Sequence, residues 1–358
     1  MLPPRNDCLL WDALQDPNAS AGPAGDPHGE GPGPEAVAVP LLFGLIFVLG
    51  VLGNLLVVGV ILGLGRRGAA HPPGPTNVFL LNLSAADLGF LLVCVPPQAT
   101  VYSLPHWVFG GFLCSFGHFF TSACMLVSIF TLVAMSADRY LAVVRARSAL
   151  CVRSRRNALA GVLLIWGASL ACSGPVARHQ VLLTGHPSAP NSTFCWEDWS
   201  GAGQGRRAYK VLVLVLGFLL PLLLICWCYS RVLCHLHKKM MTKSKKSKRS
   251  KKKTTQTVLL VVAAFTICWM PHHIIAMWVE FGTFPLNDAT FAFRIISHCL
   301  SYGNSCVNPI LYAFMSENFR KACRQVLGRH FLSSMPPHGT VVRFRLDNFS
   351  TTHSTTNV

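Results

Sequence analysis

Charged residues are scarce in this chain. Only 13% of its 358 residues are Asp, Glu, Lys or Arg, whereas 51% are hydrophobic. A soluble domain carries about a quarter charged residues, so this composition excludes an ordinary soluble protein and is typical of a membrane protein. Acidic residues are scarcer still, at 14 against 31 basic ones, and the net charge is +17. The basic residues stand in short links between apolar runs, so we interpret them as a membrane-topology signal and expect no nucleic-acid partner.

Three other features are missing, and each argues against a class of protein. The apolar runs do not alternate polar and apolar residues with period two, which argues against a transmembrane β-barrel. No internal repeat is detectable, which disfavours a membrane transporter, the competing class. The aqueous segments hold no catalytic constellation, so we do not expect an enzyme. Residues 1–7 lack the apolar core of a signal peptide, so we expect the first long helix to act as the anchor.

Seven apolar stretches dominate the chain. Each has about 20 residues or more, enough to cross the ~30 Å hydrocarbon core as a helix. Prolines inside them are tolerated because neighbouring helices and hydroxyl side chains satisfy the freed backbone groups. The sequence therefore predicts an all-α membrane protein, a seven-transmembrane-helix bundle over 37–314, with spans at roughly 37–64, 76–102, 112–144, 157–175, 209–236, 255–281 and 289–314.

The links between these stretches predict the orientation. Basic residues crowd three of them, at 66–67, 145–156 and 238–253, whereas residues 1–36 are mainly acidic. Positive charge is retained on the cytoplasmic side of a membrane. We therefore expect a multi-pass plasma-membrane protein with its N-terminus outside and its C-terminus inside. The lysine run at 243–253 is expected to contact anionic membrane lipids.

The segments on the outer side carry signals of an extracellular location. Residues 1–36 are rich in Pro and Gly, which predicts a disordered extracellular tail. Sequons mark Asn18 and Asn191 as glycosylation candidates.

Most of the 14 cysteines lie within the spans, where Cys behaves as a small buried hydrophobe. Three are placed on the outer side: Cys8, Cys114 and Cys195. We expect a disulfide between Cys114 and Cys195, which would tie the loop at 176–208 to the outer end of the third helix.

The C-terminal region begins with a predicted amphipathic helix on the cytoplasmic membrane surface, residues 315–328. Cys323 lies on its apolar face and is a palmitoylation candidate, with an unmodified apolar contact as the alternative. Residues 329–358 are expected to be a disordered cytoplasmic tail. Its terminal Val358 fits the groove of a PDZ-domain protein, with an ordinary phosphorylation tail as the alternative.

Polar residues inside a membrane are expensive and usually serve function. Several lie along the spans, together with a series of short motifs in a fixed order. Across nearly the whole chain this series resembles the rhodopsin-like (class A) G-protein-coupled receptors. The matching residues are Gly53-Asn54, Leu83-Ser-Ala-Ala-Asp87, Asp138-Arg139-Tyr140, Trp166, Pro221, Tyr229, Cys268-Trp269-Met-Pro271 and Asn308-Pro309-Ile-Leu-Tyr312.

The resemblance implies an activation switch that moves the sixth helix outward, with Arg139 contacting the G protein and Pro271 supplying a kink. Many family members hold this arginine with an acidic residue at the inner end of the sixth helix. Residues 251–255 of this chain contain no acid, so we expect no such lock. The switch residues are Asp138, Arg139, Tyr140, Tyr229, Trp269, Pro271, Asn308, Pro309 and Tyr312.

Asp87 is an isolated carboxylate in mid-membrane, so it either takes a proton or holds a cation. By resemblance it belongs to a sodium pocket that stabilises the resting state. An allosteric sodium ion is the only cofactor expected, and no other metal site is expected. The oxygen ligands would come from Asp87, Ser128, Asn304, Ser305 and Asn308.

The ligand class follows from further absences. The outer part of the third helix has Thr121 where an aminergic receptor has Asp, and the seventh helix has no Lys for a retinal Schiff base. The outer loop contains the run Thr193-Phe-Cys-Trp-Glu197, next to a Pro/Gly-rich segment. A long loop and a polar, aromatic mouth suit a peptide.

Longer stretches resemble the galanin receptor family, and its type 1 members most closely. They include Ala99-Thr-Val-Tyr102, Pro271-His-His-Ile-Ile275 and Trp278-Val-Glu-Phe-Gly282. Type 1 members carry another His one turn above the histidine pair, where this chain has Ala276. The resemblance implies a neuropeptide receptor for galanin, or alternatively for the related peptide spexin. It also implies an inhibitory heterotrimeric G protein that lowers cyclic AMP, and arrestin as a further partner.

The expected ligand-binding residues lie around the outer mouth. Adjacent positions on a helix point about 100° apart, so His272 and His273 cannot both face the lumen, and we expect His273 to do so. For His118, interhelical packing is the alternative to ligand contact. The predicted ligand-binding residues are His118, Thr121, His273, Glu280, Phe284, Phe291 and Arg294.

Overall fold

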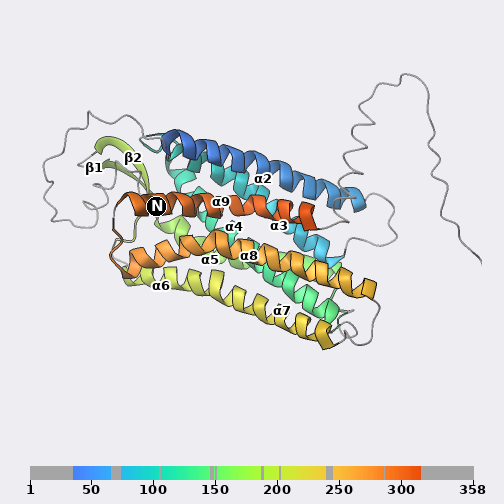
Figure 1. The fold of residues 1–358 in the computed structure, drawn as a ribbon. Coiled ribbons are helices and arrows are strands. Elements are labelled where there is room, and N and C mark those ends of the chain that lie inside the picture. Colours follow the sequence, from blue (N-terminus) through green and yellow to red (C-terminus); the bar gives the residue numbers. More distant parts are fainter. Residues whose placement is uncertain are drawn as a thin grey trace, which may run out of the picture.

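The computed structural model describes residues 35–65, 74–104, 106–145, 149, 151–186, 189–200, 203–238, 245–285 and 287–315. Over these residues the chain is a bundle of long helices, with a two-stranded hairpin at one end (Figure 1). The loop that joins α8 to α9 lies at the hairpin end of the bundle as well (Figure 1). We call this end the hairpin end and the opposite one the far end.

The observed elements follow the predicted spans closely. The first four helices are α2 (Glu35–Gly65), α3 (Pro75–Thr100), α4 (Gly110–Val143) and α5 (Arg155–His179). The hairpin consists of β1 (Gln180–His186) and β2 (Ala189–Glu197). The remaining segments are α6 (Gly203–Leu214), η2 (Val215–Leu219), α7 (Leu220–Lys238), α8 (Lys245–Phe281) and α9 (Asp288–Met315).

Six helical segments of the described chain are long and apolar enough to cross a membrane: α2, α3, α4, α5, the continuous α6–η2–α7 segment, and the part of α8 from Val262. Helix α9 is as long as these but carries more polar residues, among them Asp288, Arg294 and Asn308. It packs beside α2 and α8 (Figure 1). Leu163, Leu164 and Leu223 are among many large apolar side chains that stay exposed, as lipid-facing surfaces require.

Helix α4 is the most buried of these spans and forms the centre of the bundle. Its apolar side chains Met125, Leu126, Ile129 and Leu132 share one core cluster with residues of α2, α3, α7 and α8. Because α4 touches most of the other helices, groups on it can be positioned from several sides.

A π-helical turn, η2, interrupts the helix before Pro221. Its backbone widens so that the N–H of Leu220 bonds to the carbonyl of Val215. Proline has no N–H to donate, and single π turns in helices are frequent at functional sites. Gly217 lies in this turn, where a Cβ would come within 2.8 Å of Leu126 on α4. Glycine therefore allows η2 to approach the central helix closely.

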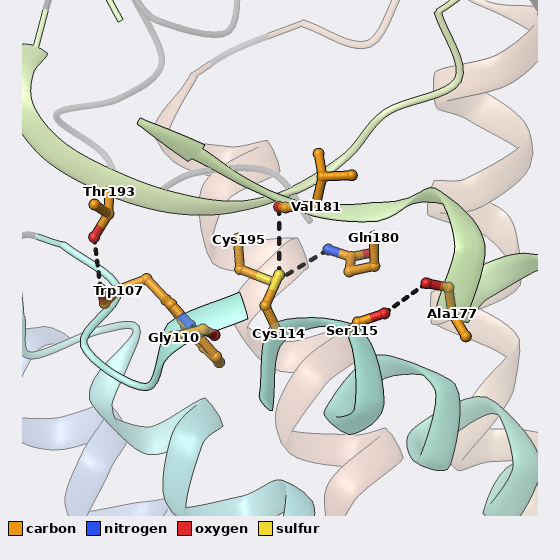
Figure 2. The surroundings of a disulfide bond; sticks show 9 residues. All are labelled: Trp107, Gly110, Cys114, Ser115, Ala177, Gln180, Val181, Thr193 and Cys195. Carbon is orange, nitrogen blue, oxygen red and sulfur yellow. Dashed lines mark hydrogen bonds between the residues drawn. A yellow bond between two sulfur atoms is a disulfide. The ribbon is translucent and has the colours of Figure 1, made fainter. Parts of the chain in front are cut away.

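The hairpin covers the end of α4 that lies at the hairpin end of the bundle. Its strands pair antiparallel from Gln180 opposite Glu197 to Thr184 opposite Thr193, and an irregularity follows before His186. The predicted disulfide between Cys114 and Cys195 is confirmed (Figure 2). The helix-rich prediction did not include these strands, so the loop between the fourth and fifth spans is more ordered than expected.

Several sequence predictions fall outside the described residues. They are the N-terminal tail with Asn18, the helix at 315–328 with Cys323, and the tail that ends at Val358. The side chains of Asn191 and Tyr312 also lie outside the described part, although their backbones belong to β2 and α9.

Candidate functional site at the hairpin end

A cavity opens among α3, α4 and α9 at the hairpin end. Two predicted ligand-binding residues, His118 and Thr121, line it together. Thr121 Oγ1 donates to the backbone carbonyl of Gly117, one turn earlier in α4. The other lining residues are Val93, Cys94, Pro97, Gln98, Trp107, Leu113, Gly117 and Tyr302.

The hairpin positions one wall of this cavity. The backbone N–H of Trp107 donates to the carbonyl of Thr193 on β2, and Thr193 Oγ1 donates back to the Trp107 carbonyl at 2.6 Å (Figure 2). Trp107 Nε1 is occupied by the Gly110 carbonyl at 2.8 Å. On the opposite side, Ser115 Oγ donates to the carbonyl of Ala177 at the end of α5. The hairpin, the loop before α4 and the top of α5 are therefore connected by hydrogen bonds around the disulfide.

The two histidines of the pair on α8 lie in different surroundings. His273 is buried and packs its ring 4.8 Å from that of Phe218 on η2, so it lies between two helices. His272 is the exposed member, with its ring edge-on to Trp269 at 5.9 Å. That His273 faces the lumen stays a prediction. The wide π turn at η2 brings Phe218 against that face of α8, and this contact was not predictable from the sequence.

Glu280 is already engaged in an ion pair. Its Oε1 lies 2.6 Å from Nε of Arg206 on α6, at an angle that does not suit a hydrogen bond. The neighbouring Arg207 guanidinium lies over the ring of Phe281, 6.0 Å from its centroid. Two cation contacts thus join α6 and α8 at the hairpin end, and a ligand that uses Glu280 has to compete with Arg206.

Three more predicted residues lie at the rim formed by α8, α9 and the loop between them. The Arg294 guanidinium lies over the ring of Phe291, 5.1 Å from its centroid. The Phe284 ring is edge-on to Trp278 at 5.1 Å. None of these three is among the residues that line the cavity with His118 and Thr121. The predicted ligand residues therefore divide into an inner group and a rim group.

A second polar cluster closes the base of the hairpin. Lys210 Nζ lies 2.7 and 2.9 Å from the two carboxylate oxygens of Glu197, and Trp199 Nε1 donates to the same carboxylate. Burial alone would raise the pKa of Glu197, but the Lys210 ammonium and these hydrogen bonds outweigh it and hold the pKa at about 2. The His179 ring stacks on Trp199 at 3.7 Å. This cluster joins the ends of α5, β2 and α6.

Asp87 lies buried in the middle of the bundle, 2% exposed. Ser305 Oγ donates to its Oδ1 at 2.9 Å, and Asn308 Nδ2 donates to its Oδ2 at 3.1 Å. Three of the five predicted sodium ligands are thus joined directly. Ser128 and Asn304 are buried on α4 and α9, and within the described part neither is hydrogen-bonded to Asp87.

The far end holds the Asp138-Arg139 pair in a network of its own. Arg153, in the link before α5, places Nε 2.7 Å from Asp138 Oδ1 and its Nη2 3.3 Å from Oδ2. Thr76 Oγ1 on α3 donates to Asp138 Oδ2 at 2.8 Å and accepts from Arg139. Arg139 therefore contacts α3, and its Nη2 also lies 3.7 Å from Oδ2 of the neighbouring Asp138.

The other predicted switch residues lie between these two regions. Trp269 is buried, with its ring 6.1 Å from that of Phe265, and Tyr229 is buried in the same core cluster. Tyr140 packs against Trp227 of α7 at 5.3 Å. Pro309 lies against Gly53, where a Cβ would come within 2.8 Å of it.

Sequence reasoning did not predict Gln98, Trp107, His272 or Tyr302 as site residues, although three of them line the cavity. A signal existed for Gln98, because it is a polar residue inside an apolar span. The contribution of Trp107 depends on its pairing with the hairpin, which the sequence did not predict.

Comparison with known proteins agrees with this geometry. Residues 53–312 match the family described as 7 transmembrane receptor (rhodopsin family). Galanin receptor type 1 of Homo sapiens is 56% identical over 311 residues, which cover 85% of this chain and 87% of the relative. The Mus musculus type 1 receptor is 52% identical over 89% of this chain and 92% of its own. Galanin receptor type 2 of Homo sapiens is 45% identical over 84% of this chain and 76% of its own. The chain belongs to the rhodopsin family of seven-transmembrane G-protein-coupled receptors and, within it, to the galanin receptors.

Proposed function

We propose that this receptor binds galanin, with spexin as the alternative peptide, at its hairpin end. The observation that carries the proposal is the 56% identity to a galanin receptor type 1 over most of both chains. A receptor of this kind is not an enzyme, so its function is to convert peptide binding into a conformational change.

The geometry of the hairpin end supports a peptide ligand. The inner cavity is lined by apolar and aromatic side chains with a few polar groups, as ligand sites usually are. The rim adds the Arg294–Phe291 contact and the Arg206–Glu280 ion pair. A peptide is long enough to contact these rim groups together, and a small amine would meet no carboxylate among the cavity residues.

We propose that the hairpin end faces the extracellular side of the plasma membrane. The disulfide between Cys114 and Cys195 lies at that end, and disulfides form and persist in oxidising compartments. The far end carries Arg145, Arg153, Arg155 and Arg156, as a cytoplasmic face does.

Activation then requires the far end to open toward a G protein. We propose an inhibitory G protein, whose activation lowers cyclic AMP, and arrestin as a further cytoplasmic partner. Trp269 and Pro271 lie on α8 below the binding region, where movement of one half of the helix relative to the other can begin. Arg139 must leave Thr76 before it can contact the partner.

We also propose that Asp87 holds a sodium ion in the resting state. The candidate ligands are oxygen atoms, which suit a hard cation, and the Oδ1 atom of Asn54 is a buried acceptor without a hydrogen-bond partner in the described region. Asp87, Ser128, Asn304, Ser305 and Asn308 would hold the ion. A cation that favours one of two states lowers the affinity of a ligand that favours the other.

The proposal is tested by peptide-stimulated nucleotide exchange on purified inhibitory G protein, with galanin, spexin and unrelated neuropeptides. Galanin or spexin should stimulate exchange, and in cells pertussis toxin should abolish the fall in cyclic AMP. A response that fully resists the toxin would overturn the inhibitory coupling. Stimulation by an unrelated peptide alone would overturn the ligand assignment.

A further inference from the structure

A short turn at the far end is tied to the first residues of α5. Asn157 Nδ2 donates to the backbone carbonyl of Val152 at 2.9 Å. The backbone N–H of Asn157 donates to Ser154 Oγ at 3.1 Å, so Ser154 is the N-cap of α5. The residue inside this turn is Arg153, which contacts Asp138. The turn therefore holds the arginine close to the aspartate.

Ser154 carries its hydroxyl in a basic sequence. Arg153 precedes it, and Arg155 and Arg156 follow it. The two following arginines are exposed, Ser154 itself is half-buried, and its backbone is extended. Protein kinases select substrates partly by the pattern of charges around the target residue, so this sequence suits a serine kinase that recognises basic residues. Because helix ends open at little cost in free energy, such a kinase can reach the hydroxyl.

Arg153 is placed so that a second anion can compete for it. Its Nε lies 2.7 Å from Asp138 Oδ1 and its Nη2 3.3 Å from Oδ2, and 30% of its side chain is exposed. A phosphoserine carries about −1.5 to −2 charges and three strong acceptor oxygens, whereas a carboxylate carries one negative charge. Consecutive Cα atoms lie about 3.8 Å apart, so a phosphate on Ser154 is attached directly beside the arginine.

We propose that Ser154 is a phosphorylation site whose phosphate draws Arg153 away from Asp138. The phosphoryl group comes from ATP, and the enzyme is a cytoplasmic serine kinase that recognises basic sequences. Ser154 Oγ attacks the γ-phosphorus, the bond between that phosphorus and the β–γ bridging oxygen breaks, ADP leaves, and the hydroxyl proton passes to the base of the kinase. The inference rests on the proposed function, because it takes the far end to face the cytoplasm.

The phosphate leaves α5 folded. Its oxygens can accept the N–H of Asn157 in place of the hydroxyl, so the helix keeps its cap. Asp138, without Arg153, keeps only the hydrogen bond from Thr76 and the pair with Arg139. One contact that connects the turn to α4 is then lost, and the population of active receptor should rise without any peptide.

The first part of the test locates the phosphate. Full receptor in lipid nanodiscs is treated with ATP and protein kinase C, a kinase that prefers basic sequences, and tandem mass spectrometry identifies the modified residues. The second part uses Ser154→Asp and Ser154→Asn, which have the same shape and are both good N-caps but differ by one charge. Each variant is made with Arg153 and with Arg153→Gln. The measurement is nucleotide exchange without peptide, on purified G proteins of the inhibitory and the other classes.

We expect phosphate at Ser154. Basal exchange should be about threefold higher for Ser154→Asp than for Ser154→Asn, the size of effect of one partly exposed ion pair. With Arg153→Gln the two variants should be equal, because the arginine that responds to the charge is gone. No phosphate at Ser154, equal or lower exchange in Ser154→Asp, or the same difference in both backgrounds would overturn the proposal. None of these measurements uses a peptide, so a receptor that binds neither galanin nor spexin would overturn only the proposed ligand.

Discussion

Asp138 is bound on both carboxylate oxygens by Arg153, at 2.7 and 3.3 Å. The aspartate is 5% exposed and the arginine 30%. The pair connects the segment just before α5 to the far end of α4. Arg139, the neighbour of Asp138, is held by Thr76. The contacts of the Asp138-Arg139 pair therefore come from α3, from the link before α5 and from the pair itself, in which Arg139 Nη2 lies 3.7 Å from Asp138 Oδ2.

Removing Arg153 should raise activity in the absence of peptide. Arg153→Gln deletes the two-point contact, which in a partly exposed site stabilises the resting state by about 1 kcal/mol, or roughly fivefold in the population of active receptor. Basal nucleotide exchange measures this change. Arg155→Gln is the matched control, because Arg155 is an exposed arginine at the start of α5, two residues after Arg153. If both variants behave alike, the Asp138–Arg153 pair does not hold the resting state.

Asp87→Asn should remove the sensitivity of the receptor to sodium. The carboxylate carries the only negative charge among the five proposed ligands, so its neutral analogue cannot balance a cation. Agonist affinity measured in sodium and in a matched large organic cation should differ for the wild type and coincide for the variant. An Asp87→Asn receptor with the wild-type salt specificity would disprove the sodium assignment.

The Arg206–Glu280 pair should stabilise the packing of α6 against α8 at the hairpin end. Glu280 is 6% exposed and Arg206 29%, so removal of the arginine leaves a buried carboxylate without its partner. We expect Arg206→Met to lower the free energy of unfolding by about 1–2 kcal/mol. The double variant Arg206→Met, Glu280→Met should recover most of this loss. Thermal unfolding in detergent of the wild type, Arg206→Met, Glu280→Met and the double variant completes this double-mutant cycle. Additive losses of stability would show that the two side chains do not interact.

The Glu197–Lys210 pair gives a pH dependence with a definite sign. The pKa of Glu197 is about 2 in the folded receptor, against 4.5 for the free side chain. Its contribution to stability is therefore fully present above pH 4.5 and is lost as the pH falls toward 2, because the unfolded chain takes up the proton first. Thermal unfolding between pH 3 and pH 7 should show a flatter dependence for Glu197→Gln than for wild type. Parallel curves would contradict the ion pair.

The helices and their order could be predicted because each span is a long apolar run whose length matches a membrane. Hydrophobicity places most of these runs, as the agreement between the predicted span 76–102 and α3 (Pro75–Thr100) illustrates. The hairpin could not be predicted in this way. Its strands are held by pairing with each other and by the hydrogen bond to Trp107. These are contacts between separate segments of the chain, so local secondary-structure propensity does not predict them.

The site was predictable in its residue types and less so in their directions. His118 and Thr121 do share a cavity, and Asp87 does meet Ser305 and Asn308. The packing of His273 against Phe218 depends on the rotation of α8 against η2, and the spacing of the two histidines carries no information on that rotation. The sequence also did not predict which residue pairs with Asp138, because Arg153 is one of several arginines between the third and fourth predicted spans.

The central claim is that a galanin-like peptide binds at the hairpin end, and saturation binding of labelled galanin to wild type and Phe291→Ala tests it most directly. Phe291 is held at the rim by Arg294, and loss of an aromatic anchor there should cost about 2 kcal/mol, or roughly thirtyfold in affinity. The account predicts saturable binding to the wild type, displacement by unlabelled galanin or spexin, and this weakening in the variant. Folded, disulfide-bonded receptor that binds neither peptide, or that binds galanin equally well without the Phe291 ring, would contradict it.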